Sequence, residues 1–234
     1  MNISTEFIQR TCPEAEIIES VLPLNHKNIL ELGCGDASIT RLIVSSGEGR
    51  IITATEVDQI QHQKNLQIED LPNVEFKLAG SEKIPANDNT FDIVFMFKSL
   101  HHVPIDLMDK ALQEVRRVLR AGGLVYISEP IFDGDFNEIL RLFHDEKLVR
   151  QLAFEAIKKS VDNKTFSLVD EMFFYSPITF NNFKEFEARI IGVTHTEHHL
   201  SNDLYTEVKQ KFENYYQKNR GDFLVPNRID ILTK

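Results

Sequence analysis

The sequence predicts an α/β protein with a doubly wound, three-layer α/β/α architecture. Short apolar runs alternate with segments of helical periodicity from about residue 28 to residue 129. This order is typical of a parallel sheet covered by helices. One run, residues 91–97, is apolar enough to be buried on both faces, as central parallel strands are. With 234 residues and no low-complexity linker, we expect a single domain over 1–234.

The expected elements follow one another with short turns. Parallel strands are predicted at residues 28–32, 51–56, 74–78, 91–97 and 124–128. A polar helix is expected over residues 59–68, and apolar residues at helical spacing predict another over 107–119. We expect Gly122 and Gly123 to stop this second helix.

The two ends of the chain differ from this core. Residues 3–21 have the spacing of an amphipathic helix, so the segment 1–24 is expected to cover a ligand cleft or to pack on the sheet. Residues 131–180 form a predicted helical insertion, with one or two helices at 135–160 and an irregular piece at 161–178. The remaining predictions are helices at 180–190 and 203–218 and strands at 193–199 and 223–232.

Composition limits the classes of partner. The net charge is −10, from 36 acidic and 26 basic residues, so nucleic acid is not expected to bind. Two cysteines, Cys12 and Cys34, cannot build a disulfide framework, which favours a reducing cytoplasm. No signal peptide is evident, and no apolar run approaches the roughly 20 residues that span a bilayer. We expect a cytoplasmic monomer or homodimer that acts on a small molecule without a membrane.

The most informative segment begins at the first predicted strand. There, Glu31-Leu32-Gly33-Cys34-Gly35 takes the chain from the strand through a tight turn toward a helix. Gly33 and Gly35 let the backbone turn sharply and let a ligand approach. A carboxylate directly before the turn suits an ammonium group better than a pyrophosphate. A dinucleotide turn also usually needs a third glycine, and this chain has Ser38 in that place.

Further motifs follow in order. Glu56 ends the second strand, and the segment from Glu82 to Pro85 precedes the fourth. Residues 100–103 read Leu-His-His-Val, and residues 118–123 read Val-Leu-Arg-Ala-Gly-Gly. Together with the glycine turn, these motifs resemble the class I S-adenosylmethionine-dependent methyltransferases, in the broad small-molecule group that includes the ubiquinone-type enzymes. The resemblance is detailed over about residues 25–130.

The resemblance implies both a sheet and a cofactor. The sheet would have seven strands in the order 3-2-1-4-5-7-6 with the last strand antiparallel, and residues 193–199 and 226–232 fit strands six and seven. The cofactor would be S-adenosyl-L-methionine, with S-adenosyl-L-homocysteine as product. Gly33, Cys34 and Gly35 would contact its methionine part, and Glu31 would hold its ammonium group.

The remaining cofactor contacts are assigned in the same way. Glu56 would accept hydrogen bonds from both ribose hydroxyls, with Asp58 as the rival carboxylate, and Val57 would pack on the adenine. The family commonly places an acid on the adenine amino group where this chain has Gly80. Backbone groups of Ser81 and Glu82, or the Ser81 hydroxyl, would have to replace it. Backbone groups of Lys98 and Ser99 would also meet the cofactor.

Histidines are the candidate catalytic residues. His101 or His102 could face the methyl acceptor and take a proton from it, or the pair could brace the start of the next helix. No metal site is expected at His195, His198 and His199, because on a strand His198 would point opposite to the other two. The aromatic residues 173–175 either line the acceptor pocket or pack against the core.

The expected function is methyl transfer to a small or medium organic acceptor by in-line displacement. Two alternatives remain open at this point: a nicotinamide-dependent oxidoreductase, and a non-catalytic module that binds a nucleoside cofactor on the same fold.

Overall fold

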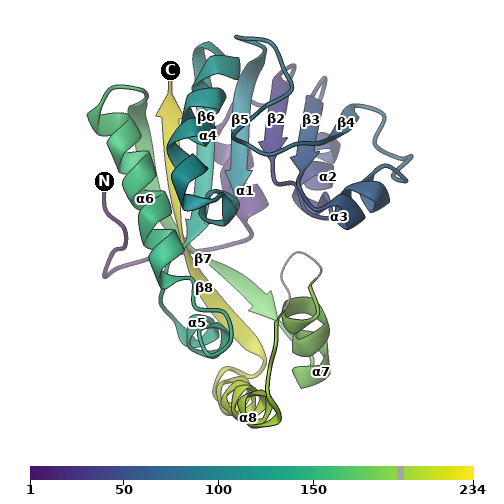
Figure 1. Ribbon diagram of the computed structural model, residues 1–234, viewed down its shortest axis with the longest axis vertical. Coiled ribbons are helices and arrows are strands. Elements are labelled where there is room, and N and C mark those ends of the chain that lie inside the picture. Colours follow the sequence, from purple (N-terminus) through teal and green to yellow (C-terminus); the bar gives the residue numbers. More distant parts are fainter. Residues whose placement is uncertain (194–197) are drawn as a thin grey trace.

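The computed structural model describes residues 1–193 and 198–234. A single eight-stranded sheet in the order β1-β7-β8-β6-β5-β2-β3-β4 runs through the molecule, with helices on both faces (Figure 1). Its parallel strands are β2 (Asn28–Leu32), β3 (Ile51–Glu56), β4 (Val74–Leu78), β5 (Phe91–Phe97) and β6 (Leu119–Pro130).

The last strand in the sequence lies inside the sheet. β8 (Asp222–Thr233) runs antiparallel to both of its neighbours, β6 and β7 (Ser167–Thr179). The two-residue strand β1 (Arg10–Thr11) pairs in parallel with β7 and forms one edge.

The helices connect the strands and range from one turn to 18 residues. They are α1 (Glu14–Val21), α2 (Ser38–Ser45), α3 (Gln59–Asn65), α4 (Met108–Val118), α5 (Asp135–Leu140), α6 (Lys147–Asp162), α7 (Phe183–Phe186) and α8 (Asn202–Asn219). A π-helical turn (Glu187–Ile191) continues α7, and two 3₁₀ turns (Leu100–His102 and Ile105–Leu107) precede α4. Among the described residues, no helix has the length and apolar character that crossing a bilayer requires.

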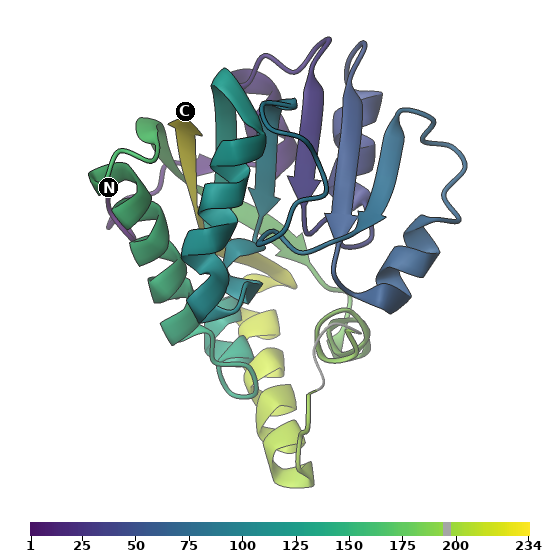
Figure 2. The ribbon, with the colours of Figure 1, turned by 45° about the horizontal axis from the view of Figure 1, so that its top comes forward.

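The central strands are buried on both faces, as their apolar runs predict. Alternate residues of a strand point to opposite faces. Leu30 and Val94 pack with α4 and α6 on one face, whereas Ile29 and Ile93 pack with α1 and α2 on the other. Figure 2 shows α4 and α6 in front of the sheet and α2 behind it.

A third apolar cluster forms a cap beyond the carboxyl ends of the parallel strands. The outer halves of β7 and β8 extend past the sheet and carry α5, α7 and α8 (Figure 1). The buried side chains of this cap are mostly aromatic: Ile139, Phe180, Phe183, Phe186, Val208, Phe212 and Phe223. The cap has its own core, separate from the two on the faces of the sheet.

The predicted fold class and strand order are confirmed. In the numbering of the structure, the order 3-2-1-4-5-7-6 corresponds to β4-β3-β2-β5-β6-β8-β7, with β8 antiparallel and with β1 added at the edge. The prediction missed β1, because a two-residue strand leaves no periodic pattern in the sequence.

The position of strand six was predicted wrongly. It is β7, which covers most of the piece expected to be irregular, because its side chains are partly exposed without a regular alternation. The residues expected to form this strand, 193–199, are not in a strand at Val193, His198 or His199, and the rest of them lie outside the described residues.

Two other boundaries also differ from the prediction. The N-terminal helix is only α1, because the chain before it runs along the edge of the sheet as β1. Gly122 and Gly123 do not stop α4, which ends at Val118. They lie inside β6, where Gly122 has a φ of +74°.

Candidate functional site

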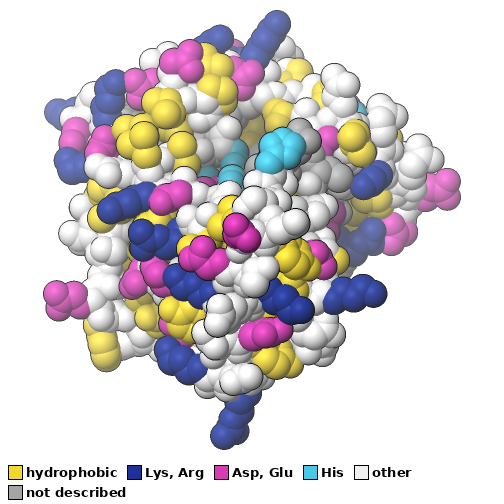
Figure 3. All heavy atoms as spheres, turned by 60° about the horizontal axis from the view of Figure 1, so that its bottom comes forward, with side chains coloured by type: hydrophobic (Ala, Val, Ile, Leu, Met, Phe, Trp, Pro, Cys, Tyr) yellow, Lys and Arg dark blue, Asp and Glu magenta, His cyan; other side chains and the backbone are white. Residues whose placement is uncertain are grey.

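A cavity of about 880 Å³ lies at the carboxyl ends of the parallel strands, where doubly wound sheets bind their ligands. Figure 3 shows the face of the molecule on that side, with a hollow near histidine side chains. Nine of the eleven residues predicted to bind the cofactor line this cavity: Gly33, Gly35, Glu56, Val57, Gly80, Ser81, Glu82, Lys98 and Ser99. Glu31 and Cys34 do not line it.

The turn after β2 needs both of its glycines. Gly33 and Gly35 have φ angles of +75° and +54°, which side chains rarely allow. A Cβ on Gly33 would lie 2.9 Å from Cβ of Ser99, whose hydroxyl donates to the carbonyl of Leu32 at 2.9 Å. A Cβ on Gly35 would meet nothing within 4 Å. The turn therefore leaves open space for a ligand beside Gly35.

Glu56 connects the first two βα corners. One carboxylate oxygen accepts from the backbone N–H of Gly35 at 2.8 Å, and the other accepts from Val57 at 2.7 Å and Asp58 at 2.9 Å. A carboxylate has about four acceptor positions, so at least one stays open. Asp58, the rival candidate, caps α3 by accepting from the N–H of Ile60 at 2.8 Å.

Glu31 lies behind the turn, only 2% exposed. Its carboxylate accepts a hydrogen bond from the hydroxyl of Thr40 on α2 at 2.6 Å. Burial raises the pKa of Glu31 to about 7, and the Thr40 hydrogen bond offsets only part of that rise. A nearby cation would favour the ionised form of this carboxylate. Glu31 does not line the cavity, however, so its contact with an ammonium group stays a prediction.

The Cys34 side chain points into the protein interior rather than the cavity. Its sulfur lies 3.5 Å from the side-chain nitrogen of Asn65 on α3, and burial raises the pKa of the thiol. Asn65 also donates to the carbonyl of Gly35 at 2.7 Å. Asn65 therefore braces the glycine turn from behind, a role the sequence pattern did not indicate.

The predicted adenine edge contains a buried hydroxyl without a partner. Gly80, Ser81 and Glu82 follow β4 and line the cavity. The Ser81 hydroxyl oxygen is buried and has no hydrogen-bond partner among the described residues. Such groups are normally hydrogen-bonded, and because this oxygen is buried, a ligand in the cavity would reach it after the Ser81 side chain rotates toward the cavity.

Lys98 joins the cavity wall to the N-terminal helix. It follows β5 with a φ of +51°, and its backbone N–H donates to the carbonyl of Ser128 at 2.8 Å. Its ammonium group lies 3.3 Å from the buried carboxylate of Glu14 on α1. Of the two roles predicted for the N-terminal segment, α1 packs on the sheet and also contacts a residue of the cavity wall.

The two candidate catalytic histidines occupy different environments. His102 is exposed and lines the cavity. His101 is only 4% exposed and does not line it. Burial by itself would lower the pKa of His101, but the carboxylates of Glu129 and Glu146 outweigh burial and raise the pKa to about 9. His101 therefore contacts buried carboxylates whereas His102 faces the cavity, and the catalytic role of either histidine stays a prediction.

The other histidines and the aromatic segment are placed as follows. His195 lies outside the described residues. The His198 ring lies 4.9 Å from that of His144, and no metal-ligating group in the described residues includes His198 or His199. Of the aromatic residues 173–175, Phe174 is fully buried in the sheet core, which supports packing.

Several lining residues were not predicted from the sequence. They come from the loop after β2, from α3, from the turns before α4 and from the end of the π-helical turn: Asp36, Gln61, Lys64, Val103, Pro104, Leu107, Gly192 and Val193. The last two show that the cap closes one side of the cavity. The sequence could have indicated these residues only because they lie close to a motif or to the end of a predicted helix.

The fold and the cavity define a doubly wound α/β domain with a ligand-sized cavity at the carboxyl ends of its parallel strands. Comparison with known proteins points to a related family. Residues 30–127 match the family model of a methyltransferase domain. This segment contains the glycine turn, Glu56 and the two-histidine turn. The match covers less than half of the chain, and it supports the predicted resemblance to the class I S-adenosylmethionine-dependent methyltransferases, with the enzyme class and the cofactor that the resemblance implies.

Known relatives are similar over only part of their length. An uncharacterized methyltransferase from Mycobacterium bovis is 32% identical over 108 residues, which span 46% of this chain and 42% of that protein. A tRNA U34 carboxymethyltransferase from Shewanella woodyi is 29% identical over 146 residues, 60% of this chain and 42% of that protein. The chain thus spans less than half the length of these curated relatives.

The fold is shared more completely with a solved structure. The YcgJ protein from Bacillus subtilis has a TM-score of 0.65 against this chain, at 14% identity. That alignment covers 94% of this chain and 97% of the other. The likeness establishes a common architecture, including the region of the cap.

Proposed function

We propose that this chain binds S-adenosylmethionine in the 880 Å³ cavity and transfers its methyl group to a small or medium organic acceptor. The observation that carries the proposal is the convergence of residues from the ends of β2, β3, β4 and β5 on one cavity. They include a glycine turn with open space and a carboxylate that joins two βα corners. The matched methyltransferase domain spans all four strands.

The residues of the cavity fit the parts of this cofactor. The space beside Gly35 would take the methionine part, whose ammonium group Glu31 would attract from behind the turn. The remaining acceptor capacity of Glu56 would serve the ribose. The unpartnered hydroxyl of Ser81 would bind the adenine edge, where the family more often has an acid.

The bound cofactor supplies an electrophilic methyl group on a positively charged sulfur. The protein must align the acceptor with that group and exclude water, and such alignment is worth roughly 7–11 kcal/mol of barrier. The acceptor would enter between the turn His102–Pro104 and the cap residues Gly192 and Val193, which face the same cavity. His102 would contact an acceptor held there.

Calorimetry tests the cofactor assignment. S-adenosylhomocysteine should release or absorb heat on binding at one site per chain, whereas NAD should give none. NAD binding without S-adenosylhomocysteine binding would favour the oxidoreductase alternative. Formation of S-adenosylhomocysteine from the methylated cofactor, with acceptor present, separates an enzyme from a module that only binds.

A labelled methyl group tests the acceptor class. The chain is incubated with a methyl-labelled cofactor and either a small-molecule extract or a total RNA fraction. Because the net charge of −10 opposes binding to phosphates, the label should enter the small-molecule fraction. Label in RNA would overturn the proposed acceptor class while leaving the cofactor assignment intact.

A further inference from the structure

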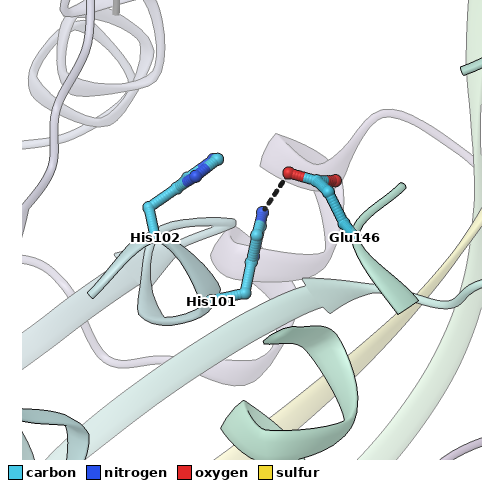
Figure 4. Close-up of side chains that lie close together, drawn as sticks. All are labelled: His101, His102 and Glu146. Atoms are coloured by element: carbon cyan, nitrogen blue, oxygen red, sulfur yellow. Dashed lines mark ion pairs between the residues drawn. The ribbon is translucent and has the colours of Figure 1, made fainter. Parts of the chain in front are cut away.

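Beside the cavity, histidine and glutamate side chains from separate segments meet in a cluster. His101 and His102 come from the 3₁₀ turn after β5, and Glu146 comes from the residue that precedes α6. One potential metal-ligating atom from each residue lies within 4.8 Å of the other two. Figure 4 shows the three side chains close together, with His101 directed at Glu146. They are the one such group among the described residues.

The inner histidine is held in the orientation that a metal ligand needs. Nδ1 of His101 pairs with a carboxylate oxygen of Glu129, whose other oxygen accepts from the backbone N–H of Leu100 at 3.0 Å. This contact leaves Nε2 of His101 facing Glu146, at 3.5 Å from Oε1. A metal ion bound there would take the place of the proton on Nε2. Metal-binding histidines almost always have such a carboxylate or carbonyl on their other ring nitrogen.

Glu146 is likewise oriented by its neighbours. Arg150 donates to Oε2 at 2.5 Å from one guanidinium nitrogen and at 3.1 Å from another. The other oxygen, Oε1, faces His101 and also lies 2.8 Å from Nε2 of His144. Oε1 therefore lies close to the imidazole nitrogens of both His101 and His144.

We propose that His101, His102 and Glu146 bind a divalent transition-metal ion of the zinc type, with Glu129 as the positioning residue behind His101. Two imidazoles and one carboxylate are a donor set that zinc accepts, with a further position open to water or substrate. Zinc lies about 2.0–2.2 Å from such ligands in a tetrahedral arrangement, so ligand atoms that are now up to 4.8 Å apart must approach one another. His102 is the exposed member of the cluster, and its ring centroid lies 4.1 Å from that of His101.

The location gives the ion a use. His102 lines the cavity in which the acceptor is proposed to bind, so the ion would stand at the acceptor side of that cavity. An ion there would lower the pKa of an acceptor hydroxyl that contacts it. The proposal goes beyond methyl transfer itself, which needs no metal, and its failure would leave the cofactor assignment untouched.

Direct metal binding tests the proposal. The tag-free full chain is stripped with a chelator, and Zn²⁺ is titrated by calorimetry, with the bound metal counted by mass spectrometry. We expect one ion per chain. His102→Ala should lose most of this affinity, and Glu129→Gln should weaken it by about 10–100-fold. Circular dichroism and urea denaturation should confirm that both variants stay folded.

The control is a histidine outside the cluster. His26 precedes β2, at the amino ends of the parallel strands, whereas the cluster lies at their carboxyl ends. Its φ is +59°, a conformation that asparagine also tolerates. His26→Asn should bind the metal as the unmodified chain does. Substitution of zinc by Co²⁺ should give visible absorption bands that His102→Ala abolishes. Absence of one-to-one binding, or equal binding by the His102→Ala variant, would overturn the proposal.

Discussion

Among the predicted cofactor residues, Glu56 has a carboxylate that accepts three backbone hydrogen bonds. Its carboxylate ties the backbone of the first βα corner to that of the second, so it shapes the cavity as well as facing it. The same three N–H groups keep the carboxylate in place before any ligand arrives. A ribose would therefore meet an acceptor that is already oriented.

Replacing this side chain should weaken cofactor binding. Glu56→Ala removes a charged acceptor and leaves the N–H of Gly35 without its partner. We expect the affinity for S-adenosylhomocysteine to fall by about 1–3 kcal/mol, measured by calorimetry. Glu75→Ala is the control, because this exposed acid lies on β4 and does not line the cavity. An unchanged affinity in Glu56→Ala would contradict the ribose assignment.

Ser81 allows a sharper test, because stability and binding should respond differently. Its hydroxyl has no hydrogen-bond partner among the described residues, so Ser81→Ala should leave the free energy of unfolding unchanged or slightly raised. Cofactor affinity should nevertheless fall by about 0.5–1.5 kcal/mol, the net worth of one hydrogen bond. Denaturant titration and calorimetry on the same preparations measure both quantities, with the exposed Ser45→Ala as control. A variant that binds as tightly as the parent would exclude this contact.

At the scale of elements, the cap depends on its aromatic core. Phe212 on α8 is buried among Phe183, Phe186 and Phe223, with a ring centroid 4.9 Å from that of Phe186. Phe212→Ala should lower the free energy of unfolding by about 3–5 kcal/mol, as other large-to-small changes of buried aromatic residues do. Urea denaturation measures this loss.

The control for this prediction lies on the same helix. Asn214 is exposed, so Asn214→Ala should change stability by less than about 0.5 kcal/mol. Because most cavity residues come from the strand ends, S-adenosylhomocysteine should still bind to Phe212→Ala below its unfolding transition. A stability loss as small as that of Asn214→Ala would show that the cap core is not packed as described.

The elements that sequence patterns predict well are those buried on both sides. β2 and β5 are continuous apolar runs because helices cover both of their faces. β7 was missed because much of it is exposed and its buried and exposed residues do not alternate regularly. Its sequence therefore shows neither the two-residue period of a strand nor the 3.6-residue period of a helix. Its identity as a strand depends on pairing with β8, more than forty residues away in the sequence.

The same distinction separates predicted from unpredicted site residues. Gly33, Gly35 and Glu56 belong to local motifs whose backbone geometry repeats, so their positions followed from the sequence. Glu129 and Glu146 reach His101 only through tertiary packing, across 28 and 45 positions of the chain. Nothing in the sequence around Glu129 or Glu146 indicates that either residue contacts His101.

At the scale of the whole molecule, buried acids should make stability depend on pH. Burial raises the pKa of Glu31 from 4.5 to about 7 and that of Asp230 from 3.8 to about 6. Between each pair of values the folded state holds more protons than the unfolded state, so stability falls as pH rises. For the ligand-free chain we expect a decline between pH 5 and about 8.

A single substitution isolates one part of this decline. Glu31→Gln should remove on the order of 2–3 kcal/mol of the difference between these pH values, measured by urea denaturation at each pH. Glu69→Gln is the control, because that acid is exposed. If Glu31→Gln has the same pH profile as the parent chain, Glu31 ionises normally and cannot act as a buried partner for an ammonium group.

The internal position of β8 bears on how the protein forms during synthesis. A ribosome makes β6 and β7 long before it makes β8, yet β8 is the strand that joins them. Until about residue 233 has emerged, β7 lacks the strand that joins it to β6. Before β8 is made, the edges of β6 and β7 that it will pair with are therefore exposed. A ribosome that stalls late would leave a chain with unpaired strand edges, which is prone to aggregate.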